Sequence, residues 1–144
     1  MRDFLFALSF FVAIITSANA ATTTVGPFPN EDHSDTLCQF QIITKTVVDY
    51  AEAGRPNDIY HSEPADNGWT TMFYSVGQNA QGEDVRNYTV NWTPNPPVVT
   101  TTSGATETVT QIIIVRLATT TGGGYPNPPT TTYSDVDPNL ISTQ

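Results

Sequence analysis

Two asparagine–aromatic–threonine triplets follow one another closely in the sequence and can carry N-linked sugar. They read Asn87-Tyr88-Thr89 and Asn91-Trp92-Thr93, which match the acceptor pattern N-x-S/T. On an extended strand Asn87 and Asn91 fall on one face, about 13 Å apart at ~3.3 Å per residue. Tyr88 and Trp92 fall on the opposite face. The spacing predicts two glycans side by side, with both aromatic rings turned toward the core.

Patterns for catalysis or metal binding are weak by comparison. The chain has 2 histidines, and neither lies in a nucleophile, zinc or phosphate motif. The acidic stretches "NEDHSD" (30–35) and "HSEPAD" (61–66) lack the glycine bend and distal acid of a calcium loop, so we interpret both as solvated surface. No carboxylate pair stands out for glycoside hydrolysis. The sequence predicts a protein that is not an enzyme and has no cofactor or metal site.

Aromatic residues offer a different kind of site. The candidates for a sugar-stacking surface are Tyr60, Trp69, Tyr74 and Trp92. Aromatic residues at alternating strand positions also fit a hydrophobic core, so both interpretations stay open. Carbohydrate or a cell-surface protein is the class of partner that these residues suggest.

The first twenty residues have the form of a secretory signal peptide. Residues 4–15 are almost entirely apolar, and Ala18-Asn19-Ala20 is a small-x-small cleavage site. The apolar run is too short for a ~20-residue membrane span, and the polar ending "DVDPNLISTQ" lacks the hydrophobic tail of a lipid-anchor signal. We expect cleavage between Ala20 and Ala21 and a chain secreted to the extracellular space or cell wall, without a membrane span.

Charge and cysteine content narrow the class further. With 5 basic against 14 acidic residues the formal net charge is −9, which excludes the basic footprint of a nucleic-acid-binding protein. Cys38 is the 1 cysteine of the chain, so it cannot form an internal disulfide. Because it lies on the apolar face of a predicted strand, we expect it to be buried and unpaired; pairing with another chain is the alternative.

Period-two alternation predicts the strands that position these residues. In "LCQFQIITKTVVDY" (37–50) Cys38, Phe40 and Ile42 fall on one face, and Gln39 and Gln41 on the other. Further strands are expected at 69–76, 85–93, 98–102 and 107–118, the last with Ile113 and Val115 in the core. These features predict an all-β fold over residues 37–118, either a small antiparallel β-sandwich or a partial barrel. An immunoglobulin-like β-sandwich is the arrangement that the number of strands favours.

The flanking segments differ in composition. Residues 21–36 are interpreted as a flexible lead-in and residues 119–144, rich in threonine, proline and glycine, as a disordered tail. The phrase "PNPPVVTTT" (94–102) returns as "PNPPTTT" (126–132), and we interpret these echoes as linkers. The threonine runs are either sites of O-linked sugar or unmodified linker.

The second half of the chain resembles the threonine-rich repeats of fungal cell-wall adhesins and flocculins, in which a threonine-rich strand segment ends in a proline joint. The residues that carry the resemblance are 94–97, 100–102, Gly104, 107–109, 112–115 and 126–129. The resemblance implies a glycosylated, β-structured repeat on a cell surface, with a role in adhesion or wall structure.

These features together favour a secreted, glycosylated, non-catalytic cell-surface or cell-wall protein. A small secreted binding module, such as a lectin or an effector, is the first alternative. An enzyme of unrecognised type is the second.

Overall fold

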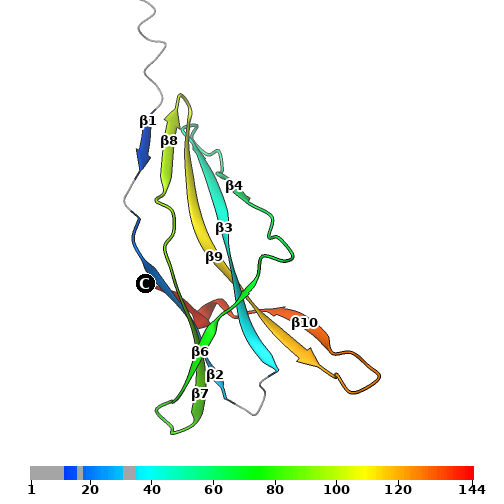
Figure 1. Ribbon diagram of the computed structural model, residues 1–144. Coiled ribbons are helices and arrows are strands. Elements are labelled where there is room, and N and C mark those ends of the chain that lie inside the picture. The colour runs from blue at the N-terminus through cyan, green and yellow to red at the C-terminus, as the bar shows by residue number, and fades with distance from the viewer. Residues whose placement is uncertain (1–11, 16–17, 31–34) are drawn as a thin grey trace, which may run out of the picture. The chain divides into compact units, whose positions relative to one another are not determined.

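The computed structural model of the protein describes residues 12–15, 18–30 and 35–144 (Figure 1). It confirms the all-β prediction. In chain order the elements are β1 (Val12–Ile15), β2 (Ala21–Pro29), β3 (Thr36–Tyr50), β4 (Asp58–His61), β5 (Thr70–Thr71), β6 (Phe73–Gln78), β7 (Asp84–Trp92), β8 (Val98–Thr102), β9 (Ala105–Thr121), β10 (Thr130–Asp135), the 3₁₀ turn η2 (Pro138–Leu140) and β11 (Ile141–Thr143).

Antiparallel pairing joins the strands into two sheets in a sandwich-like arrangement. The larger sheet has 7 strands in the order β1-β8-β9-β3-β4, with β10 also paired to β9 and β5 also paired to β3. The smaller sheet has 4 strands in the order β11-β2-β7-β6.

The chain divides into two compact units. The first comprises Ile42–Pro64 and Thr93–Ile112 together with the described residues before Ala20. The second comprises the described residues of Ala20–Gln41, Ala65–Trp92 and Ile113–Gln144. Strands β3 and β9, with 15 and 17 residues, contribute residues to both units.

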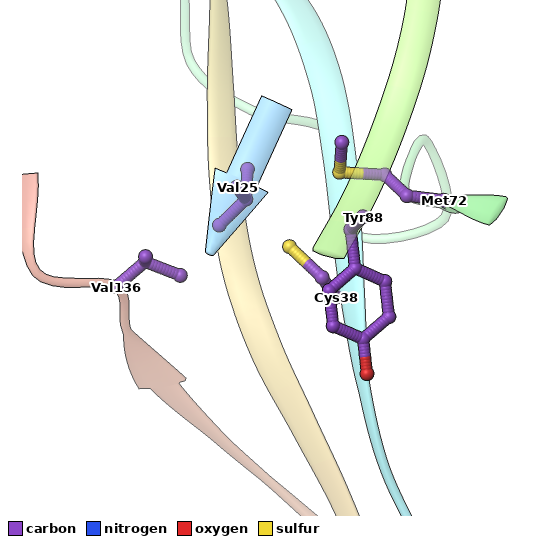
Figure 2. Packing of buried hydrophobic residues seen from close by; sticks show 5 residues of the cluster. All are labelled: Val25, Cys38, Met72, Tyr88 and Val136. Atoms are coloured by element: carbon purple, nitrogen blue, oxygen red, sulfur yellow. The ribbon is translucent and has the colours of Figure 1, made fainter. Parts of the chain in front are cut away.

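The hydrophobic core lies within the second unit (Figure 2). Its five buried side chains come from both sheets and from the segment before η2: Val25, Cys38, Met72, Tyr88 and Val136, none of them more than 7% exposed. Partly buried residues that pack against them are Phe28, Leu37, Phe40, Val90, Val115, Leu117, Leu140 and Ile141. The two inner faces therefore meet in this unit as the layers of a sandwich do.

The first unit buries far fewer side chains. It holds β8, β4 and part of β3 and β9, and Ile43 is the one buried hydrophobic residue among its described side chains. On the edge strand β4, Ile59 and Tyr60 are 55% and 57% exposed. Ladder hydrogen bonds rather than apolar burial therefore account for most of the order in this unit.

The strand expected at 69–76 changes sheets halfway. Its first part, β5, pairs with β3, and its second part, β6, pairs with β7. Met72 lies at the change, where its N–H donates to the carbonyl of Cys38 at 2.9 Å and its side chain is 2% exposed. A strand that switches sheets closes the corner of a sandwich, and one hydrophobic residue anchors that corner here.

Parts of the lead-in and of the tail form strands, which corrects the expectation for these segments. β2 occupies most of the lead-in, and its Thr23 and Val25 are fully buried. In the tail, Val136 joins the core and β11 pairs with β2, with Ile141 opposite Val25. Low apolar content suggested that these segments stay disordered. Threonine nevertheless has high β propensity, and the segments are ordered by pairing of β2 with β7, of β10 with β9 and of β11 with β2.

The repeated proline phrase marks the start of a strand and is not a linker. Each copy precedes a threonine-rich strand that pairs antiparallel with β9. β8 follows residues 94–97 and places Val98 opposite Val109, and β10 follows residues 126–129 and places Thr130 opposite Thr121. Proline has no N–H for the ladder, so the phrase ends one stretch of chain before the next strand begins.

Strand β9 is longer and more exposed than predicted. It extends beyond 107–118 at both ends, and residues 112–115 are half-buried, whereas they were expected to be buried on both sides. Val115 packs against the core as predicted, but Ile113 is not a member of the core cluster. Val115 faces the core cluster, whereas Ile114 faces the other side of the sheet, where it borders open space.

The predicted cleavage point coincides with an element boundary. β2 begins at Ala21, and the three residues before it are exposed and lie in no strand. Within residues 1–20 the structure describes β1, whose Val12–Ile15 pair with β8, and residues 18–20; the rest of the predicted leader lies outside the described residues. Over the described chain, none of the helical segments has the length and apolarity needed to cross a membrane.

Candidate functional site

The outer face of the larger sheet carries an arginine between two aromatic rings in the second unit. Val115 and Leu117 of β9 pack inward against the core, so Arg116, which lies between them, points outward. β10 places Asp135 directly opposite Arg116. Trp69 reaches the same face from the residue before β5. Strands that are distant in sequence therefore bring these side chains together.

The geometry of the cluster is that of a stacked cation. The Arg116 guanidinium carbon lies 4.1 Å from the Trp69 ring centroid and 3.7 Å from the Tyr133 ring centroid. Its Nε donates to Gln39 Oε1 at 2.9 Å. Both ring distances are within the range of an attractive cation–π contact. We call these four residues with Asp135 the aromatic–arginine patch.

A hollow of about 380 Å³ opens on this patch. It is lined by Trp69, Ile114, Val115, Arg116, Tyr133, Ser134 and Asp135. Tyr133 is 55% exposed and Trp69 is half-buried, so ring surface remains accessible. Among the described residues, Arg116 donates its hydrogen bond through Nε. The N–H groups on Nη1 and Nη2 can therefore donate to a ligand.

A glycine turn fixes the position of Trp69. Gln41, on the outer face of β3, is only 8% exposed because residues 65–68 cover it. Its Nε2 donates to the carbonyl of Ala65 at 3.0 Å, and the N–H of Gly68 donates to the same carbonyl. A Cβ on Gly68 would overlap the amide of Gln41, so a larger residue there would displace the Gln41 side chain from its contact with Ala65. The sequence predicts an outward-facing Gln41 but not its burial, which depends on this distant turn.

The four aromatic residues singled out in the sequence do not gather. Trp69 lies on the patch, whereas Tyr60 belongs to β4 of the first unit. Tyr74 packs on Tyr88 with ring centroids 5.7 Å apart, and Trp92 donates from Nε1 to Thr23 Oγ1 at 2.9 Å. Sequence reasoning missed Tyr133 because residues 119–144 were interpreted as disordered, and without that ring it gave Arg116 no partner. The alternation within "TTTYSD" was the available signal.

The two sequon asparagines lie on the outer face of the smaller sheet. Their neighbours Arg86 and Tyr88 are buried on the inner face of β7, as the strand phase predicts for Tyr88. Asn91 is exposed, and its Oδ1 accepts a hydrogen bond from Thr22 Oγ1 at 2.8 Å. Asn87 is half-buried beside Gly26. Both asparagines share a face, and Asn91 is the more accessible of the two.

Cys38 is fully buried in the core (Figure 2). Burial raises the pKa of its thiol from 9.0 to about 12, because an ionised sulfur would lose its hydration there. A neutral, inaccessible thiol is a poor nucleophile and a poor metal ligand. In this conformation Cys38 acts as a small core residue, as its strand phase predicts.

The acidic stretches do not form a metal site in the described part of the chain. Residues 31–34 of "NEDHSD" lie outside it. His61, Glu63 and Asp66 are all exposed, and the described residues contain no group of three or more His, Cys, Asp and Glu side chains arranged to hold a metal ion.

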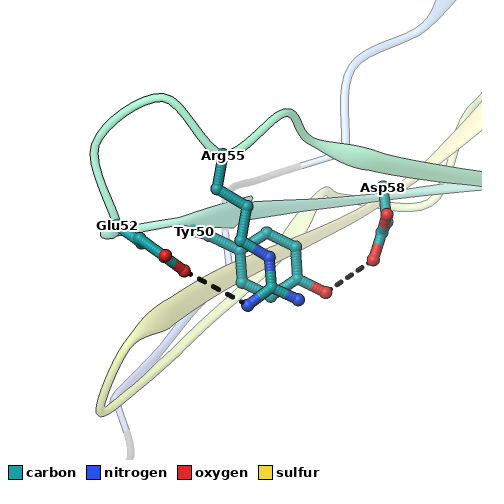
Figure 3. A network of polar contacts seen from close by, with 4 residues as sticks. All are labelled: Tyr50, Glu52, Arg55 and Asp58. Carbon is teal, nitrogen blue, oxygen red and sulfur yellow. Dashed lines mark hydrogen bonds and ion pairs between the residues drawn. The ribbon is translucent and has the colours of Figure 1, made fainter.

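A second polar cluster, in the first unit, ties the loop after β3 to β4 (Figure 3). The Tyr50 hydroxyl donates to Asp58 Oδ2 at 2.6 Å, and this hydrogen bond raises the pKa of Tyr50. The Arg55 guanidinium carbon lies 3.5 Å from the Tyr50 ring centroid and its Nη1 lies 3.7 Å from Glu52 Oε2. These groups already interact with one another, so we interpret the cluster as a structural contact that holds residues 51–57 in place.

No known protein family matches the chain, and neither the curated proteins nor the solved structures include a significant match.

Proposed function

We propose that this is a secreted, glycosylated protein of the cell surface or cell wall, which acts by adhesion and not by catalysis. We further propose that it binds carbohydrate at the aromatic–arginine patch. The observation that carries the proposal is Arg116 held between Trp69 and Tyr133 beside an accessible hollow.

The chemistry of the patch suits a sugar. A pyranose ring has an apolar C–H face and a rim of hydroxyl groups. Aromatic rings such as Trp69 and Tyr133 pack against the apolar face. Planar polar groups on Arg116 and Asp135 can donate to and accept from the hydroxyls. Binding sites generally combine apolar walls with a few fixed polar groups in this way.

Net charge limits the kind of carbohydrate. At −9 the chain repels polyanions over distances comparable to the Debye length, about 8 Å at physiological salt. Acidic polysaccharides are therefore disfavoured. We expect a neutral polymer such as a glucan, mannan or chitin.

The secretory part of the proposal is supported by the leader pattern and the sequons of the sequence, and by the positions of both relative to the strands. The leader pattern ends where β2 begins, at Ala21, and both sequons lie on an outward face of β7. The proline phrases at 94–97 and 126–129, which carry the resemblance to wall-adhesin repeats, each precede a strand that pairs with β9. A mass measurement on protein secreted by a eukaryotic host tests cleavage and glycosylation together.

The lining of the hollow supports the non-catalytic part of the proposal. Glycoside hydrolysis usually needs two carboxyl groups about 5–10 Å apart. Among the described residues that line the hollow, Asp135 is the one carboxylate. Arg116 is the other charged group of the lining, so the lining holds one carboxyl group and not two.

Co-sedimentation with insoluble polysaccharides tests the binding proposal. The secreted chain is mixed with β-glucan, chitin and mannan, and Trp69→Ala and Tyr133→Ala are compared with Tyr125→Ala. Tyr125 is fully exposed at 101% and lies outside the patch, so it is the matched control. Each patch variant should weaken binding about tenfold, which corresponds to ~1.4 kcal/mol. Absence of binding to every polymer, or equal losses in all three variants, would overturn the proposal.

A further inference from the structure

Phe73 is an isolated aromatic side chain on the outer face of the smaller sheet. It is 88% exposed on the edge strand β6. Strand pairing places it directly opposite Thr89, so it shares the outer face of β7. Its neighbours on this face, by register, are small and polar: Thr22, Thr24, Ser75, Asn87, Thr89 and Asn91. No packing within the unit accounts for a phenylalanine at this position.

The two sequon asparagines flank the residue that faces Phe73. Thr89 lies midway between Asn87 and Asn91 on β7. Directly opposed side chains have Cβ atoms about 4.5–5.5 Å apart, and diagonal ones about 7–8 Å. Each asparagine is therefore a diagonal neighbour of Phe73. The first sugar attached to either asparagine therefore lies close enough to contact the phenyl group.

The amide oxygens of both asparagines lie on the side of β7 that faces β2. Asn91 Oδ1 accepts from Thr22 of β2. Asn87 Oδ1 also lies against β2, since a Cβ built on Gly26 would be 2.7 Å from it. With both oxygens toward β2, each Nδ2 is directed away from that strand. The strand on the other side of β7 is β6, which carries Phe73.

We infer that Phe73 is the platform on which the first N-acetylglucosamine of an N-linked glycan on β7 packs. The C–H face of the sugar covers the phenyl ring and removes its apolar surface from water. The inference rests on the glycosylation in the proposed function and adds a specific contact to it. It concerns the smaller sheet, so it is independent of the aromatic–arginine patch on the larger one.

Thermal unfolding of defined glycoforms tests this contact. The secreted chain is trimmed with an endoglycosidase that leaves one N-acetylglucosamine on each occupied asparagine. It is compared with the variant carrying Asn87→Gln and Asn91→Gln, in the wild-type, Phe73→Ala and Tyr125→Ala backgrounds. We expect the sugar to raise the melting temperature by about 4 °C in the wild-type and Tyr125→Ala backgrounds. The increment should vanish in Phe73→Ala. The single Asn→Gln variants then assign it to one site or both.

The outcomes separate the inference from the function on which it rests. Sugar on the chain with the same increment in Phe73→Ala overturns the platform but leaves the glycosylation proposal intact. Mass spectra without sugar on either asparagine overturn both. Because Phe73 is almost fully exposed, its replacement should not unfold the unsugared chain, and the double Asn→Gln background measures any such effect directly.

Discussion

The guanidinium of Arg86 and the hydroxyl of Tyr88 meet inside the sandwich, with 3.2 Å between Nη1 and Oη. The Tyr88 hydroxyl donates onward to the carbonyl of Thr36 at 3.0 Å. Arg86 also donates through Nε and Nη2 to Asn30 Oδ1, at 3.2 and 3.0 Å, and lies over the Tyr74 ring at 4.3 Å. This network joins β7 of the smaller sheet to the first residue of β3 in the larger one. Polar contacts therefore fix how the two layers align around an otherwise small core.

Removing the Tyr88 hydroxyl should weaken this alignment. Tyr88→Phe keeps the ring but leaves the Thr36 carbonyl with only the longer contact to Arg86, at 3.4 Å. A buried acceptor that loses its partner costs about 1–3 kcal/mol. Urea unfolding should show a lower midpoint, and Tyr125→Phe, a change at a fully exposed ring, should stay within ~0.5 kcal/mol. An unchanged midpoint for Tyr88→Phe would contradict the role of the network.

Local alternation predicted the positions of β3, β7 and β8 and the inward turn of Tyr88, because a strand's phase depends only on neighbouring residues. It also placed Asn87 and Asn91 on a common face. The same phase puts Arg86 on the inner face beside Tyr88. It could not show how a charged group is accommodated there, because the hydrogen-bond partners of Arg86 are 50 and 56 residues away.

Composition was a poor guide to the threonine-rich segments that pair with other strands. A threonine-rich segment has too little apolar surface to fold alone, which favoured a disordered tail. β10 and β11 are instead ordered by antiparallel pairing with β9 and β2. Two of the five patch residues, Tyr133 and Asp135, come from β10, so the interpretation of the tail as disordered concealed part of the site. Trp69 was identified without its two partners.

Glycine is required at position 26 for two separate reasons. Gly26 has φ of +137°, a conformation that side chains disfavour. A Cβ there would also lie 2.9 Å from the Arg86 carbonyl oxygen. Gly26→Ala should cost at least about 1–3 kcal/mol. Gly77→Ala is the control because no atom lies within 4 Å of its Cβ position. Equal melting temperatures for the two variants would show that β2 is not held as described.

The Cys38 thiol predicts a pH dependence of stability at the alkaline end. Its pKa is raised from 9.0 to about 12 in the folded chain, so the unfolded state ionises first. The contribution to stability is therefore complete below pH ~9 and declines as the pH rises toward ~12, by up to about 1.4 kcal/mol per pH unit. Other groups titrate in this range, so the measurement is the difference in slope between wild type and Cys38→Ala. Parallel slopes, or reaction of the native thiol with a disulfide reagent at pH 8, would contradict its burial.

Truncation of the tail separates the two interpretations of its composition. A disordered tail can be deleted without effect, whereas the structure makes residues 136–144 part of the sandwich. Deleting them removes Val136, which is 7% exposed, and the pairing of β11 with β2. Burial of one valine alone contributes about 1.5–3 kcal/mol, so the free energy of unfolding should fall by more than that.

The control is a Gly-Gly insertion at Gly124, which lies in an exposed loop with no atom near its Cβ position. It should change the free energy of unfolding by less than ~0.5 kcal/mol. Both variants are measured by urea unfolding of the secreted chain. If the truncated chain unfolds at the same urea concentration as the inserted one, Val136 and β11 do not contribute to the core.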